Sequence, residues 1–234
     1  VMTRESFNMN NISIEPERKK KDRKALPTDI ENFSVSYSKN QQLTHNVDIE
    51  KDLRRIEKGV FNYNYSLRST PLRPLKDVDF LKPKAFRIIS DFNFSPIPEM
   101  ISFRTDLTRN YSERIARNNS GINFQMPTFV QKDLLWNRYF DFRWNLSSSL
   151  NIDFNNKNIS RIEEDEEAMT RREELDQYQL MLLELFRNPA SLGRPVDYEH
   201  TLKISYRVPI NKLPLLDFTS ANIDYSGDFG WAAG

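Results

Sequence analysis

Apolar and polar residues alternate along most of this chain with a period of two. One such run extends from Phe33 to Ile49, where the odd positions carry Phe33, Val35, Tyr37, Leu43 and Val47 and the even positions carry only Ser, Asn, Gln, Thr and Asp. Side chains on a β-strand alternate between two faces, so this period predicts a strand with one apolar face. The pattern recurs over residues 61–67, 86–94, 101–107, 136–146, 150–154, 202–208 and 221–231. The sequence therefore predicts eight strands and an all-β fold.

The composition limits what these strands can build. The chain has 34 Lys and Arg against 33 Asp and Glu, so its formal charge of +1 gives no overall field that would attract nucleic acid. Aromatic residues make up 12% of the chain, far more than a disordered chain would carry. No apolar run approaches the ~18 to 20 residues of a spanning helix. The absence of Cys excludes disulfides and thiolate metal sites.

The connections between the predicted strands differ in length. Compact turns are expected at residues 95–99, 147–149 and 209–215, and long links at about 110–134 and 159–199. Short turns on one rim and long loops on the other are typical of an outer-membrane barrel, whose strands need ~9 to 11 residues. A helix is expected from about Glu163 to Arg187, inside a loop insertion at about 160–198, because the acidic start suits the helix dipole and Asn188-Pro189 ends it.

We therefore expect two regions. Residues 1–32 form an irregular basic segment with the run Arg18 to Lys24, which either contacts lipid headgroups or is a solvated linker. Residues 33–234 form the antiparallel barrel segment. The helix packs on its own protein at the rim or on a partner.

Residues that carry chemistry are sparse. The only histidines, His45 and His200, are 155 residues apart and lack carboxylates at ligand spacing, so neither is given a role. The acidic run Glu163 to Glu167 lacks the Asp-x-Asp-x-Asp-Gly loop of a calcium site. Six Gly provide no phosphate-binding loop. We expect no catalytic residue, no metal, no cofactor and no enzyme activity. The aromatic and Arg residues of WNRYFDFRW could stack single-stranded bases, but the rings share their face with apolar residues, so no nucleic-acid partner is expected.

Four segments of the chain resemble a known family. They are FNYNYSLRSTPLRPLKDVDFLK, AFRIISDFNFSPIPEMISFRTDLTRNYSERIARN, LLWNRYFDFRWNLSSSLNIDF and VPINKLPLLDFTSANIDYSGDFGWAAG. They are similar to the SprA/Sov family, the giant outer-membrane translocon of the type 9 secretion system of Bacteroidota, which is also tied to gliding motility. The resemblance runs from about Phe33 to Gly234, and it implies that this chain is an internal fragment of one very large transmembrane β-barrel.

The resemblance also implies a function and partners. These strands would be one arc of a wall around a water-filled lumen, with aromatic residues toward outer-membrane lipid and Asn, Ser, Asp and Arg toward the lumen. The cargo would be folded proteins with a C-terminal sorting domain, and a PorV-type barrel and a plug protein would close the openings. Two alternatives stay open: a self-contained eight-stranded outer-membrane barrel, and a soluble β-sandwich or adhesin-like interaction domain with a dry core between two sheets.

Overall fold

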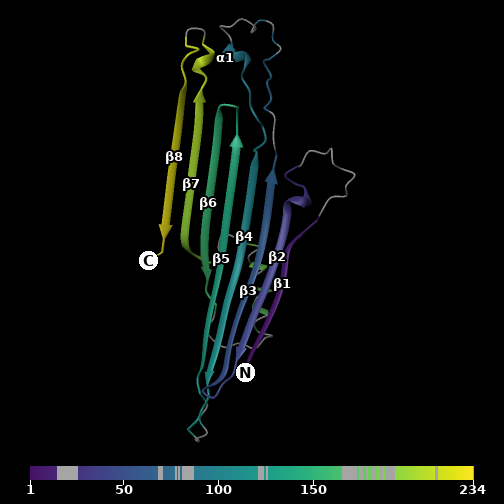
Figure 1. Ribbon diagram of the computed structural model, residues 1–234, viewed down its shortest axis with the longest axis vertical. Coiled ribbons are helices and arrows are strands. Elements are labelled where there is room, and N and C mark those ends of the chain that lie inside the picture. Colours follow the sequence, from purple (N-terminus) through teal and green to yellow (C-terminus); the bar gives the residue numbers. More distant parts are fainter. Residues whose placement is uncertain are drawn as a thin grey trace.

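The fold is all-β, with eight antiparallel strands in one sheet. The computed structural model describes the chain except for residues 15–25, 68–70, 77, 79, 81–86, 121–123, 125, 165–172, 174–175, 178, 181–182, 185–186, 188–192, 214–215 and 234. The strands are β1 (Met2–Ser13), β2 (Phe33–Thr44), β3 (Ile49–Ser66), β4 (Met100–Ala116), β5 (Thr128–Asn145), β6 (Leu150–Ile162), β7 (Arg194–Val208) and β8 (Ala221–Ala232). Each strand pairs with its neighbours in sequence, so the sheet is a meander in chain order (Figure 1).

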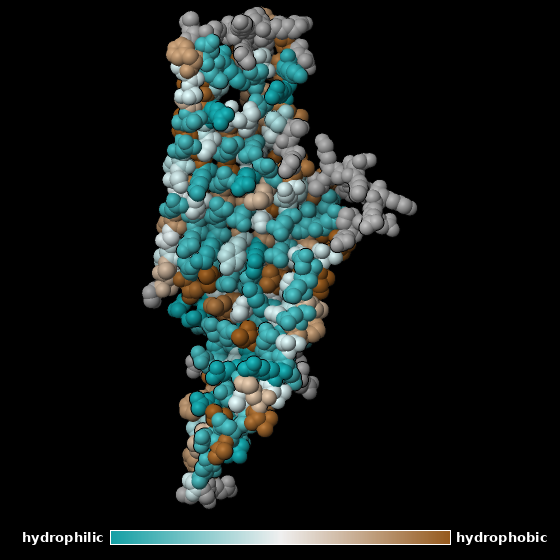
Figure 2. Space-filling view, viewed as in Figure 1, coloured by the Kyte–Doolittle hydropathy of each residue, from teal (hydrophilic) through white to brown (hydrophobic). Residues whose placement is uncertain are grey.

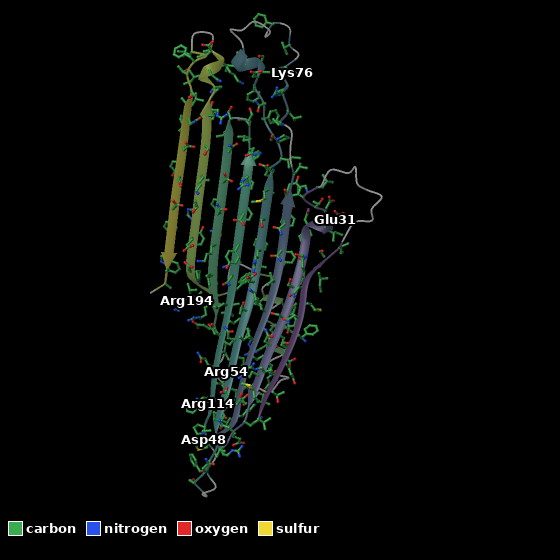
Figure 3. The ribbon with its side chains drawn as sticks, in the orientation of Figure 1. Glu31, Asp48, Arg54, Lys76, Arg114 and Arg194 are labelled. Atoms are coloured by element: carbon green, nitrogen blue, oxygen red, sulfur yellow. The ribbon has the colours of Figure 1, made fainter. Side chains whose placement is uncertain are left out.

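The connections lie at two opposite ends of the sheet. One end, which we call the upper rim, carries residues 67–99, 146–149 and 209–220, together with α1 (Arg87–Ser90) and η5 (Ile210–Lys212) (Figure 1). The other end, the lower rim, carries residues 45–48 and the described residues of 117–127, and the connection 163–193 joins the lower ends of β6 and β7. Figure 3 shows Lys76 at the upper rim and Asp48, Arg54 and Arg114 toward the lower rim. The short 3-10 helix η2 (Ile30–Asn32) leads into β2.

Polar side chains fix the two tight turns. The Asn46 Oδ1 atom accepts hydrogen bonds from the backbone N–H groups of Asp48 (3.0 Å) and Ile49 (2.7 Å). The Ser147 hydroxyl accepts from the N–H groups of Ser149 (3.2 Å) and Leu150 (3.0 Å). Such local side-chain bonds satisfy the backbone where the ladder ends, which explains why these residue types lie at the turns.

The prediction of an irregular segment over residues 1–32 is wrong for its first part. Met2–Ser13 forms β1, which pairs with β2 from Met2 opposite Thr44 to Ser13 opposite Ser34. A β-bulge between Met9 and Ile12, where Asn11 has a φ of 51°, shifts the register. Phe7 and Met9 occupy odd positions, but the bulge brings the even-numbered Ile12 onto the same face. The strand therefore lacks a strict period of two and was not predicted. The basic run Arg18 to Lys24 lies outside the described residues.

The strand predicted over residues 86–94 does not form. Arg87–Ser90 is the short helix α1, and among the described residues of this connection the only β-pairing is an isolated bridge between Leu72 and Phe94. The total of eight strands is right because β1, which was not predicted, replaces this one. Alternation makes a strand possible, but a strand also needs a neighbour that accepts its backbone hydrogen bonds.

Several predicted boundaries also differ from the structure. The run from Phe33 to Ile49 is divided by the turn at residues 45–48, so His45 lies just beyond β2 and not within a strand. Much of the link expected over 110–134 is strand, because β4 continues to Ala116 and β5 begins at Thr128. Short turns were expected on one rim and long loops on the other. The long connection 67–99 and the short turn 146–149 lie at the same rim, so this prediction is wrong. The antiparallel segment was expected to begin at residue 33, but β2 pairs with both β1 and β3, so the sheet begins with β1.

Most of the helix predicted from Glu163 to Arg187 lies outside the described residues. Those described between 173 and 187, such as Glu173, Leu180 and Arg187, are helical and exposed. Leu175, Leu182, Leu185 and Phe186, which are apolar residues of the predicted helix, are not among them.

The hydrophobic core is very small for a chain of this length. Among the described residues, the buried hydrophobic side chains are Leu53, Tyr65, Tyr111, Leu134, Trp136 and Ile162. Leu134, Trp136 and Ile162 form one cluster, against which Leu107 packs. The described strands form a single sheet with no second sheet facing it. Stability therefore depends mainly on the backbone ladders and on contacts within each face.

Candidate functional site

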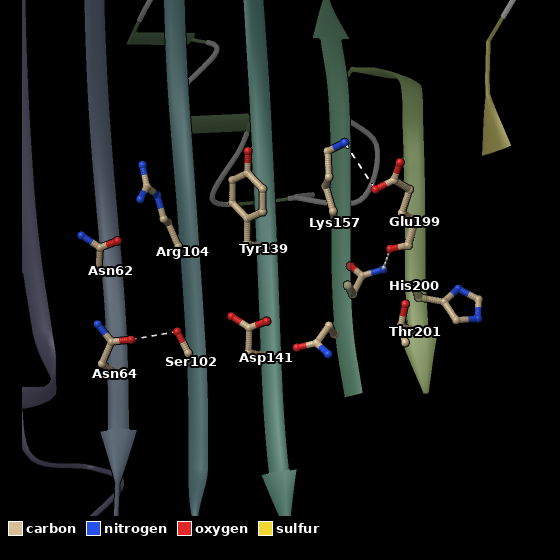
Figure 4. A pocket seen from close by; sticks show the side chains of 12 residues that line it. Asn62, Asn64, Ser102, Arg104, Tyr139, Asp141, Lys157, Glu199, His200 and Thr201 are labelled. Carbon is tan, nitrogen blue, oxygen red and sulfur yellow. Dashed lines mark hydrogen bonds and ion pairs between the residues drawn. The ribbon is translucent and has the colours of Figure 1, made fainter. Parts of the chain in front are cut away.

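One face of the sheet carries hydrophilic side chains on five adjacent strands. Direct partners across β3 to β7 form rows, for example the row of Asn62, Arg104, Tyr139, Lys157 and Glu199 and the next row of Asn64, Ser102, Asp141, Asn155 and Thr201 (Figure 4). We call the face that these ten residues share the polar face. Figure 2 views the molecule from this side, and hydrophilic residues dominate it. The residues of both rows line a groove of about 610 Å³.

Three charged residues of the groove, Arg104, Lys157 and Glu199, have ion-pair partners. The Arg104 guanidinium donates two hydrogen bonds of 2.8 Å to the Asp106 carboxylate, which also lies 3.3 Å from the Lys58 ammonium. The Lys157 ammonium lies 2.7 Å from Asp197 and 3.4 Å from Glu199. Such pairs on an accessible surface contribute little to stability. Their effect is to leave a hydrated surface without a strong local excess of charge.

Uncharged polar groups complete the polar face. The Ser102 hydroxyl donates to Asn64 Oδ1 at 2.8 Å, and Asn62 donates to the Ser34 hydroxyl at 3.4 Å. Asn145 donates to the Glu99 carboxylate. Among the residues that the structure describes, no group of three or more His, Cys, Asp or Glu could hold a metal ion. The surface offers hydrogen bonding and hydration.

The opposite face carries most of the aromatic residues, including Trp136, Phe140, Phe142 and Trp144 of β5. Phe142 lies opposite Phe154 and Trp144 opposite Ile152, whereas Arg143 pairs with Asp153 on the polar face at 2.7 Å. The Phe140 and Phe154 ring centroids are 6.1 Å apart, and those of Phe142 and Trp144 are 6.2 Å apart. The prediction that Trp136, Phe140, Phe142 and Trp144 share one face of a continuous strand, with Asn137, Asp141, Arg143 and Asn145 on the other, is confirmed.

Apolar residues extend this aromatic face across all eight strands. We call the following set the apolar band: Phe7, Met9 and Ile12; Phe33, Val35 and Tyr37; Phe61, Tyr63 and Tyr65; Ile101, Phe103 and Leu107; Phe140, Phe142 and Trp144; Leu150, Ile152 and Phe154; Tyr198, Leu202, Ile204, Tyr206 and Val208; and Ala221, Ile223, Tyr225, Phe229 and Trp231. Many are strongly exposed, including Phe7 (52%), Phe229 (53%) and Ile223 (59%). Tyr65 is buried, and described residues of the 67–99 connection lie beside Leu150 and Tyr206 at the upper rim, so the band is covered only in part.

The apolar band runs obliquely across the strands. On β8 it extends from Ala221 to Trp231 and is centred at Ser226, whereas on β2 it is centred at Val35. When direct partners are followed from strand to strand, Val35 on β2 aligns with Trp231 on β8. Trp231 lies five residues beyond Ser226, and β2 lies six strand spacings from β8. With a rise of ~3.4 Å per residue and ~4.8 Å between strands, the band is inclined by roughly 30° to the perpendicular of the strands.

Amphipathic rings lie at the margins of the band on β7 and β8. Tyr198 and Trp231 are direct partners near the lower margin, and Tyr206 lies toward the upper margin. Between them are Leu202 and Ile204. Tyr and Trp have an apolar ring and a polar group, so they suit a boundary between an apolar layer and water.

Below the band, the aromatic face carries both the buried cluster of Leu134, Trp136 and Ile162 and the charged Arg109, and it is partly covered. Arg109 is only 5% exposed, and its guanidinium donates to the Glu164 carboxylate at 2.9 Å. Because Glu164 follows β6 and Arg109 belongs to β4, the start of the 163–193 connection crosses this face at β5. Gly193, at the other end of the connection, has a φ of 85°, and a Cβ placed there would lie 3.0 Å from Ser160 Cβ.

A polar notch interrupts the band between β5 and β6. The Arg138 guanidinium lies 4.2 Å from the centre of the Trp136 ring and donates to Asn158 (3.0 Å) and Ser160 (2.8 Å). One row nearer the centre of the band, Asn156 donates to the Glu199 backbone carbonyl at 3.2 Å. This notch was not predicted from the sequence. Its signal is the loss of apolar alternation after Phe154, where Asn156 and Asn158 take the positions of the aromatic face.

The two histidines lie far apart in the fold. His45 is at the lower rim, where its Nδ1 atom contacts the Glu50 carbonyl oxygen. His200 lies in β7 on the aromatic face, stacked on Phe229 with ring centroids 5.3 Å apart and edge-on to Tyr198 at 5.5 Å. The structure does not bring the two together.

Comparison with known proteins gives no further assignment. No protein-family model matches the chain, and no curated protein matches it. Among the described residues, no helix is long and apolar enough to cross a membrane.

Proposed function

We propose that this sheet forms part of the wall of a protein-conducting barrel in the outer membrane of a Bacteroidota bacterium, as the resemblance to the SprA/Sov translocons of type 9 secretion implies. One observation carries the proposal. A single layer of antiparallel strands exposes an oblique apolar band on one face and a hydrated polar surface on the other. In water, so large an exposed apolar surface would favour aggregation, whereas in a bilayer it lies in its preferred solvent.

The geometry of the band supports membrane insertion. Strands of transmembrane barrels are tilted by ~35 to 45°, so the hydrocarbon layer of the bilayer crosses the strands at an oblique angle. The inclination of the apolar band, roughly 30°, is close to this tilt. The strands have 12 to 18 residues, more than the ~9 to 11 that the bilayer needs, and the excess of the longer strands extends toward the lower rim. Tyr and Trp at the margins match the aromatic girdles of such barrels.

The polar face supports the role of a conduit. Arg104, Lys157 and Glu199 are paired within the sheet, so a passing polypeptide meets mainly water, neutral hydrogen-bonding groups and compensated charges. Such a wall does no bond chemistry. Folded cargo with a C-terminal sorting domain, a PorV-type barrel and a plug protein are the partners that the resemblance implies, and gliding motility is the wider process.

The alternatives fit the sheet less well. A soluble sandwich or adhesin-like domain requires a second sheet over the aromatic face, and the described residues contain none. A self-contained eight-stranded barrel requires β1 to pair with β8, but these strands are the two ends of the sheet. Lipid does not tolerate an unpaired strand edge, so we propose that further strands continue the wall beyond both.

Single-cysteine labelling of the membrane-embedded protein tests the proposal, because this chain contributes no cysteine of its own. Cysteine at Asp141, on the polar face, should react with a water-soluble maleimide. Cysteine at the adjacent Phe142 should react only with a lipid-soluble maleimide. Equal reaction of both with the water-soluble reagent would contradict the assignment of the faces.

A further inference from the structure

A cavity of about 450 Å³ lies at the upper rim, where the 67–99 connection folds over the aromatic face. Its floor is Leu150 of β6 and Tyr206 of β7, which are direct partners on that face. Its walls include Ile88, Phe92 and Phe94 of the connection and Leu146 at the end of β5. The cavity is therefore continuous with the top of the apolar band.

Backbone and side-chain bonds hold the connection in place. The Ser95 N–H donates to the Leu146 carbonyl at 2.8 Å, and the Ser95 carbonyl accepts from the Trp144 indole at 2.8 Å. Asn93, which is buried, accepts from the Ser148 N–H at 2.7 Å. The walls of the cavity are thus anchored to the β5–β6 turn, so the cavity is a built feature of the rim.

The polar group beside the cavity is an ion pair between two rim connections. The Lys212 ammonium, from the β7–β8 connection, lies 3.2 Å from the Asp91 carboxylate. Both side chains line the cavity and are partly exposed. An ammonium next to an apolar cavity at the edge of an apolar layer is suited to a phosphate that carries a hydrocarbon chain.

We propose that this cavity holds one acyl chain of a membrane phospholipid, with the lipid phosphate on Lys212. The inference rests on the proposed membrane location of the apolar band. Aliphatic and aromatic walls fit a hydrocarbon chain, and the volume lies within the ~300 to 1,000 Å³ of small-molecule sites. Phe92 (52% exposed) and Ile89 (47% exposed) present further apolar surface beside the cavity, where the rest of the chain and neighbouring lipid would contact it. The bound lipid would fasten the 67–99 connection to the wall.

Native mass spectrometry of the full-length protein, extracted from membranes in mild detergent, tests this site. We expect one retained phospholipid, identified by its mass. Leu150→Trp fills part of the cavity, and displacing about two methylenes of the acyl chain lowers the lipid-bound fraction by about a factor of ten. Ile223→Trp is the matched control, because Ile223 lies on the same face, opposite Tyr206, but does not line the cavity.

Two charge variants test the phosphate contact with opposite signs. Lys212→Gln should lower the lipid-bound fraction several-fold, whereas Asp91→Asn should raise it by removing the competing carboxylate.

Retention of lipid by Leu150→Trp equal to that of Ile223→Trp would overturn the site, as would a retained mass that is a peptide, a lipoprotein acyl group or detergent only. If the wild-type protein reaches the outer membrane and exports cargo but retains no lipid, the site fails and the proposed function stands. If it is not membrane-embedded, the proposed function fails.

Discussion

Replacing Phe142 by Arg should be the most damaging single change on the aromatic face. On β5, halfway between β2 and β8, the centre of the apolar band falls between Phe140 and Asp141. Phe142 is therefore within about two residues, or ~7 Å, of the centre. A lipid-facing Arg near the bilayer midplane costs ~2 to 4 kcal/mol, and loss of the edge-to-face contact with Trp144 adds ~0.5 to 1.5 kcal/mol.

The expected total of ~3 to 5 kcal/mol lowers the ratio of assembled to unassembled protein by roughly 10² to 10³ or more, since each 1.4 kcal/mol is about tenfold. Three controls separate the causes. Phe142→Leu removes the ring without adding charge. Ala221→Arg places the same charge at the margin of the band, where the cost is ~0 to 1 kcal/mol. Asn145→Arg places it on the polar face, where it can still donate to Glu99, and should be nearly silent.

The measurement is the urea midpoint of the protein refolded into phospholipid vesicles, together with the assembled fraction in the outer membrane. The order of destabilisation should be Phe142→Arg first, then Phe142→Leu, with Ala221→Arg and Asn145→Arg close to wild type. An Asn145→Arg variant as damaging as Phe142→Arg would refute the assignment of inside and outside. An Ala221→Arg variant as damaging as Phe142→Arg would refute the position of the band.

Three further predictions concern the rest of the sheet. Gly193→Ala should lower the unfolding free energy by ~1 to 3 kcal/mol, because Gly193 has a positive φ and an added Cβ would lie close to Ser160 Cβ. Gly59→Ala, where an added Cβ would have nothing within 4 Å, should lower it much less, and the urea midpoints of the two variants test this difference. Arg109→Met should cost ~3 to 5 kcal/mol by leaving the Glu164 carboxylate buried without its guanidinium, and adding Glu164→Leu should recover most of the loss in a double-mutant cycle. His200→Ala should leave cargo export intact once assembly is normal, and loss of export from a normally assembled variant would reveal a function of that imidazole.

The period-two pattern determined which side chains share a face. Alternation is a local property of an extended backbone, so Phe142 and Asp141 were assigned to opposite faces without knowledge of any neighbouring strand. The same pattern predicted the all-β class and the approximate positions of β4 to β8. It also indicated the chemical character of the two candidate surfaces, because the identity of the alternating residues is written in the chain.

Only the tertiary structure decided which extended segments become strands and how they are aligned. Residues 86–94 alternate in sequence, yet Arg87–Ser90 forms α1, and Ile88, Phe92 and Phe94 line the rim cavity. Met2–Ser13, with a weaker and bulged pattern, pairs along β2. The inclination of the apolar band and the pairing of Arg109 with Glu164 depend on register across several strands. Register is set by hydrogen bonds between segments distant in sequence, and periodicity within one segment carries no information about its partner.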